Sequence, residues 1–68
     1  MIDTNKLKGI IVANGMTQQE VAKKLDITPK TFYMKMARGV FLSNEINDMI
    51  DILQIDDPVP IFFAKEVT

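Results

Sequence analysis

The chain has 68 residues, of which 47% are hydrophobic, a formal net charge of −1, and no cysteine or histidine. This length suits one small domain over residues 1–68, and this composition excludes disulfides, the usual zinc sites and a histidine general base. We therefore expect no enzyme, no cofactor and no small-molecule substrate. The apolar runs at residues 10–13 and 61–64 are too short for a membrane span or a signal peptide, which predicts a soluble, cytoplasmic protein.

The first predicted helix begins at a cap on Asp3 or Thr4 and runs to about Asn14. Gly15 suits the end of this helix, because glycine readily adopts the left-handed conformation that often follows a last turn. Apolar residues at helical spacing predict its buried stripe: Leu7, Ile10 and Ile11.

Residues 17–38 predict two short helices joined by a tight turn at residues 26–28. Thr17 and Glu20 have the spacing of a capping box, which opens the first helix. Thr28 is expected to cap the second helix, and Pro29 falls at its first position, where a missing N–H costs nothing. Ile27 is the expected apolar plug between the two helices. The expected core residues and the closing glycine are Val21, Ala22, Leu25, Phe32, Met36 and Gly39.

A fourth helix is predicted after a cap at Ser43, with Asp48 and Asp51 on its solvated side. Its apolar stripe is Ile46, Met49, Ile50 and Leu53. Asp57 followed by proline predicts the start of a short fifth helix over residues 58–66. The sequence thus predicts an all-α fold of five short helices around one core.

These features together resemble a known family. The capped helix with Ala22 at its middle, the Asp-Ile-Thr turn and the following helix that ends in glycine resemble the helix-turn-helix of lambda-repressor-like (Cro/C1-type) phage regulators. The pattern KTFY-x-KM…G-x-F…EI…I-x-x-L…DDP…IFF is similar to small Cro-like proteins from phages of Gram-positive bacteria, and the likeness runs from Thr4 to Phe63. It implies a dimeric regulator of the lytic–lysogenic switch that binds operator double-stranded DNA, with the second motif helix in the major groove.

Carried over by position, the resemblance implies two sets of DNA contacts within a motif of about residues 17–38. The base contacts would be Thr28, Lys30, Thr31, Tyr33 and Met34. The phosphate contacts would be Gln18, Lys35 and Arg38. The charges agree with this, because residues 1–41 hold seven Lys/Arg against three Asp/Glu, whereas residues 42–68 hold one against six. A basic half is typical of a protein that turns one face towards a polyanion.

Three positions depart from the family pattern. Asp26 replaces the usual turn glycine, although aspartate tolerates a left-handed conformation. Pro29 and Met34 stand where relatives often carry polar or basic base readers. Two sites for bidentate hydrogen bonds to bases are therefore lost.

A second interpretation stays open because of these departures. The chain could be an antirepressor or modulator that binds the phage's repressor protein and blocks or alters its DNA binding. Tyrosine and methionine are enriched at protein interfaces, and the candidate partner surface is Tyr33, Met34, Phe62 and Phe63. The run of residues 61–63 is compatible with a lid on the core or with a homodimer contact, and burial in the core is expected for one of the two phenylalanines rather than for both.

Overall fold

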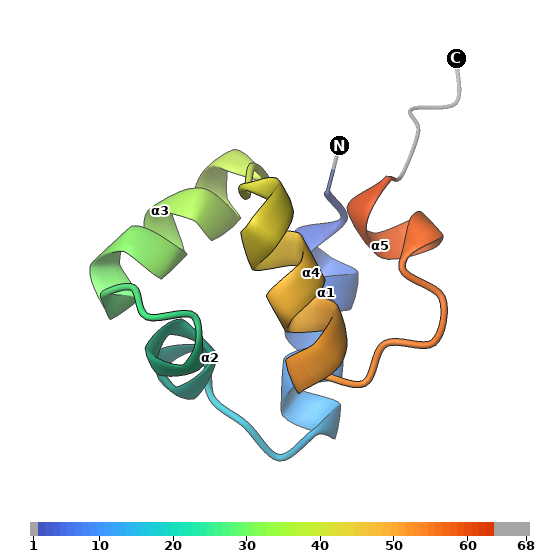
Figure 1. Ribbon diagram of the computed structural model, residues 1–68, viewed down its shortest axis with the longest axis horizontal. Coiled ribbons are helices and arrows are strands. Elements are labelled where there is room, and N and C mark those ends of the chain that lie inside the picture. Colours follow the sequence, from blue (N-terminus) through green and yellow to red (C-terminus); the bar gives the residue numbers. More distant parts are fainter. Residues whose placement is uncertain (1, 64–68) are drawn as a thin grey trace.

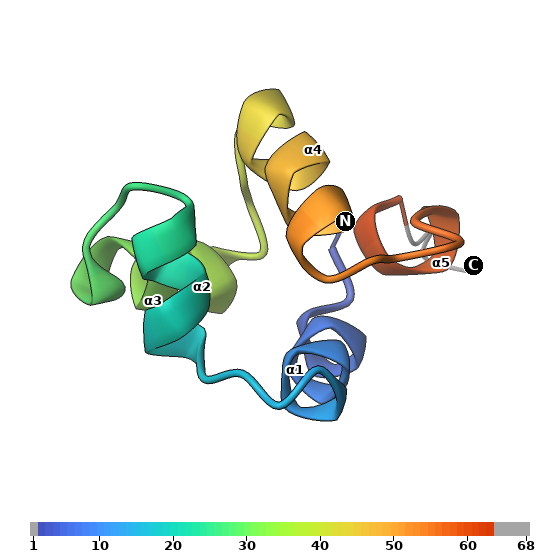
Figure 2. The ribbon, with the colours of Figure 1, turned by 60° about the horizontal axis from the view of Figure 1, so that its bottom comes forward.

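The computed structural model describes residues 2–63, which form five helices and no strand. The helices are α1 (Thr4–Ala13), α2 (Gln18–Lys24), α3 (Pro29–Arg38), α4 (Ser43–Ile52) and α5 (Val59–Phe62). The all-α prediction is confirmed over this range. In Figures 1 and 2, α2 and α3 occupy one end of the molecule and α5 the other, with α1 and α4 between them.

The first two helices begin at the predicted caps. The Asp3 carboxylate accepts a hydrogen bond from the Lys6 amide over 3.1 Å. The Thr17 hydroxyl accepts from the Glu20 amide over 3.1 Å, and the Glu20 carboxylate accepts from the Thr17 amide over 3.0 Å. These bonds satisfy amides that have no partner within their own helix.

The predicted cap of α4 is wrong by one residue. Ser43 is the first helical residue, and the cap position belongs to Leu42, whose side chain has no hydrogen-bond acceptor. The Glu45 carboxylate instead accepts from the Leu42 amide over 2.8 Å. This register follows from the tertiary structure, because Glu45 is buried and Phe41 packs in the core immediately before the helix.

Each of α1 to α4 is followed by a residue with a left-handed backbone. These residues are Gly15, Asp26, Gly39 and Gln54, with φ angles of 69°, 61°, 69° and 51°. After α2, the left-handed Asp26 lets the Ile27 amide donate to the Ala22 carbonyl over 3.1 Å, which closes the helix and reverses the chain. The predicted turn is confirmed, and the half-buried Ile27 packs against the core.

The core is formed by apolar side chains from all five helices. Its largest fully buried side chains are Phe32, Leu7, Ile11, Met49, Leu53 and Val21. The Phe32 ring from α3 packs against the Phe41 ring with centroids 5.5 Å apart and a tilt of 56°, a favourable arrangement for two aromatic rings. As predicted, Phe32 and Met36 face the core, whereas Asp48 and Asp51 are exposed on α4.

Two long-range hydrogen bonds fasten α1 to the second half of the chain. The Asp3 amide donates to the Ile61 carbonyl in α5 over 2.7 Å. The Asn14 side chain donates to the Leu53 carbonyl at the end of α4 over 3.2 Å. Since α1 is held at both of its ends, it forms a fixed support that contacts α2 and α5.

The fifth helix is shorter than predicted. It follows Pro58, ends at Phe62, and is four residues long. Residues 64–66 of the predicted helix lie outside the described part of the chain. Phe62 is buried, with 3% of its surface exposed, whereas Phe63 is 57% exposed.

Candidate nucleic-acid interface

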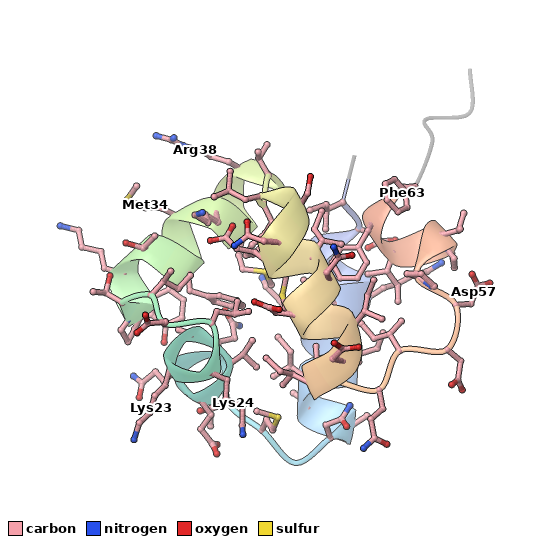
Figure 3. The ribbon with its side chains drawn as sticks, in the orientation of Figure 1. Lys23, Lys24, Met34, Arg38, Asp57 and Phe63 are labelled. Atoms are coloured by element: carbon pink, nitrogen blue, oxygen red, sulfur yellow. The ribbon has the colours of Figure 1, made fainter. Side chains whose placement is uncertain are left out.

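The outward face of α3 is the most distinctive surface of the described residues. Because Phe32 and Met36 turn into the core, side chains on the opposite side of the helix point into solvent. Figure 3 shows Met34 and Arg38 projecting from α3 away from the body of the molecule. The exposed residues of α3 are Pro29, Lys30, Tyr33, Met34, Ala37 and Arg38, which we call the α3 face.

The α3 face combines apolar and basic side chains. Tyr33 is 44% exposed and Met34 is 45% exposed, so neither packs into the core. Lys30 precedes Met34 by one helical turn, and Arg38 follows it by one turn. The arrangement places a cation at each end of the helix and an apolar contact surface between them.

Two of the predicted base contacts also hold the start of α3. The Thr28 hydroxyl accepts from the Thr31 amide over 3.2 Å and donates to the Thr31 hydroxyl over 2.9 Å. Thr28 is therefore occupied as the predicted cap of the helix. The Thr31 hydroxyl accepts this bond and keeps its own proton for another partner. Of the two threonines, Thr31 is the better donor to a ligand.

Lys35, predicted as a phosphate contact, is paired with a carboxylate in the structure. Its ammonium lies 2.7 Å from each of the two Glu45 carboxylate oxygens and is about one quarter exposed. Among residues 2–63, the only other bond of that carboxylate is to the Leu42 amide, so the pair joins α3 to the start of α4. Sequence spacing could not reveal this, because the partner lies ten positions away on another helix.

Gln18 and Tyr33 come together at a surface hollow of about 460 Å³. It lies where the first halves of α1 and α2 meet α3, and its lining residues are Thr4, Lys8, Gln18, Tyr33, Met36 and Ala37. Lys8 belongs to none of the predicted DNA contacts. Helical spacing places Thr4 and Lys8 on one side of α1, but it does not indicate that this side would meet α3.

The predicted partner surface does not form one patch. Figure 3 shows Met34 and Phe63 on opposite sides of the molecule. Phe62 is wrong as a surface residue, because its side chain is buried in the core beside Ile61. Of the four predicted residues, Tyr33 and Met34 share the α3 face, and Phe63 lies alone on α5.

The charge asymmetry of the sequence has a counterpart in space. Lys23 and Lys24 lie on α2 at the same end of the molecule as the α3 face, whereas Asp57 lies in the loop before α5 at the opposite end (Figure 3). The exposed carboxylates of α4 are Asp48 and Asp51. Lys23 and Lys24 thus lie at the end of the molecule that carries the α3 face, and Asp57 lies away from it.

Comparisons of the chain with protein-family models, with curated proteins and with solved structures find no match. Among residues 2–63, no group of three carboxylates is placed to hold a metal ion. None of the helices in this range is long and apolar enough to cross a membrane.

Proposed function

We propose that this chain is a small Cro-like phage regulator that binds operator DNA through a helix-turn-helix formed by α2 and α3. One observation carries the proposal: α3 is anchored by Phe32 and Met36 and presents its opposite face, with Lys30 and Arg38, to solvent. At 1.5 Å per residue, its ten residues span roughly 15 Å, and a major groove about 12 Å wide admits such a helix.

Base reading in this arrangement falls to a small set of donors. Lys30 can donate to the acceptor atoms of guanine, and Thr31 and Tyr33 can each donate one hydrogen bond. Met34 offers an apolar contact to a thymine methyl group. Gln18 and Arg38 flank these residues as phosphate contacts. Phe63, exposed on α5, suits a contact between two copies on a pseudo-palindromic operator.

Selection from a pool of randomised duplexes, followed by gel-shift titration at two salt concentrations, tests the proposal. We expect the protein to enrich a defined sequence and to lose affinity steeply as salt rises. Replacing Lys30 with alanine removes a base contact worth about 1–3 kcal/mol, and it should weaken binding to the enriched sequence roughly five- to 150-fold.

Lys24→Ala is the matched control, because Lys24 is an exposed lysine of α2 that lies off the α3 face. It should change affinity slightly and to the same extent for every sequence. No enrichment, or equal binding by the wild type and Lys30→Ala at both salt concentrations, would contradict DNA reading by α3.

The exposure of Tyr33 and Met34 supports a second candidate function, that of an antirepressor that binds the repressor of the same phage. The same gel shift separates the two functions when that repressor is added to its own operator. An antirepressor would remove or alter the repressor's shift without shifting the DNA by itself.

A further inference from the structure

The hollow between α1 and α3 combines hydrogen-bond donors with a positive charge. Lys8 is the only charged residue among the lining residues, and Thr4, Gln18 and Tyr33 add a hydroxyl, an amide and a phenol. Within residues 2–63, none of these four side chains is hydrogen-bonded to another part of the chain. Their donors therefore remain available for a ligand.

The carboxylates nearest to Lys8 in the sequence do not pair with its ammonium group. Asp3 accepts from the Lys6 amide at the start of α1, and Glu20 accepts from the Thr17 amide at the start of α2. The single ion pair among the described residues joins Lys35 to Glu45, on α3 and α4. No carboxylate among residues 2–63 pairs with Lys8, so its positive charge favours an anion.

The hollow also adjoins the α3 face. Tyr33 and Ala37 belong to both, since they lie one helical turn apart along the edge of α3 that meets the hollow. A helix placed in the major groove has a sugar-phosphate strand on each side. With the α3 face in the groove, the hollow meets the strand on the α1 side.

We propose that this hollow binds one phosphodiester of that DNA strand. Lys8 supplies the charge, Gln18 and Tyr33 donate hydrogen bonds to the phosphate oxygens, and Met36 with Ala37 forms an apolar floor beside the sugar. The inference rests on the proposed function and adds α1 to the DNA-binding surface. It makes Tyr33 a residue that contacts the backbone as well as the groove.

The test compares Lys8→Gln with Lys6→Gln on a random-sequence duplex of about 30 base pairs across a series of salt concentrations. The two substitutions remove the same charge from exposed positions on the same helix, but only Lys8 lines the hollow. Losing one phosphate contact should lower the slope of log affinity against log salt by about 0.9 and weaken binding about three- to tenfold near 0.1 M salt. Lys6→Gln should keep the wild-type slope.

A slope for Lys8→Gln equal to that of Lys6→Gln would overturn the proposal. If Lys30→Ala still weakened binding to the enriched sequence, the proposed function would stand without this site. If the wild-type protein bound no duplex at the lowest salt concentration, both the proposed function and the phosphate site would be contradicted. A parallel series replaces chloride with inorganic phosphate at equal ionic strength. Inorganic phosphate competes there with the DNA phosphodiester for the hollow, so the difference between the two variants should shrink, and a difference that kept its value in chloride would count against a phosphate-binding hollow.

Discussion

At the scale of single residues, Glu45 shows how one buried charge organises its surroundings. It is 4% exposed, and its carboxylate accepts from the Leu42 amide and from the Lys35 ammonium. A buried carboxylate is tolerated when each oxygen is paired in this way. The same bonds set the register of α4 and hold Lys35 away from the α3 face.

Replacing Glu45 with alanine should therefore destabilise the protein by about 2 kcal/mol, because charged hydrogen bonds are lost and the Leu42 amide loses its partner. Urea unfolding followed by circular dichroism measures the change. Asp48→Ala is the control, since Asp48 is an exposed carboxylate on the same helix. Equal unfolding midpoints for the two variants would mean that the ion pair contributes no stability.

At the scale of helices, α1 contains a glycine, Gly9, at a position where the helix has room for a larger side chain. Gly9 is exposed in the middle of α1, and a Cβ placed there meets no atom within 4 Å. Glycine inside a helix is about 0.5–1 kcal/mol less favourable than alanine, because it loses more backbone entropy on folding. Gly15 differs, since its φ of +69° closes the same helix.

We expect Gly9→Ala to raise stability by about 0.5–1 kcal/mol. Gly15→Ala should lower it by about 1–2 kcal/mol, because a Cβ is unfavourable in the left-handed conformation. Thermal unfolding of the two variants beside the wild type measures both effects. Shifts of the same sign would show that the end of α1 does not depend on the conformation of Gly15.

At the scale of the whole molecule, a small core leaves little margin of stability. Domains of this size seldom gain more than about 3–5 kcal/mol from their core. Phe32 is fully buried, contacts Phe41, and lies on the inner side of α3 directly behind the α3 face. The residue therefore links the stability of the fold to the presentation of that face.

Phe32→Ala should cost about 3–5 kcal/mol and leave much of the protein unfolded at room temperature. Met34→Ala, on the exposed side of the same helix, should change stability by less than about 0.5 kcal/mol. Circular dichroism and the dispersion of one-dimensional proton NMR spectra distinguish the two outcomes. A well-folded Phe32→Ala variant would mean that the core does not depend on α3.

Local signals predicted most of the helices and their limits. The caps of α1, α2 and α3 and the ends at Gly15, Asp26 and Gly39 depend on residues a few positions apart, so the sequence indicated them directly. The end of α4 gave no such signal, because Gln54 adopts a left-handed backbone that glutamine seldom prefers. The cap of α4 lies at Leu42 instead of Ser43 because the buried Glu45 accepts from the Leu42 amide.

The sequence by itself thus determined the number of helices, their order and the apolar side of α1 to α4, since these follow from hydrogen bonds and spacing within one or two turns. Only the tertiary structure decided which polar residues remain available to a ligand. The packing of the helices pairs Lys35 with Glu45, and it buries Phe62 while leaving Phe63 exposed. It also places Lys8 at the same hollow as Gln18 and Tyr33. Each of these outcomes depends on how separate helices pack, and the periodicity of a single helix carries no information about its neighbours.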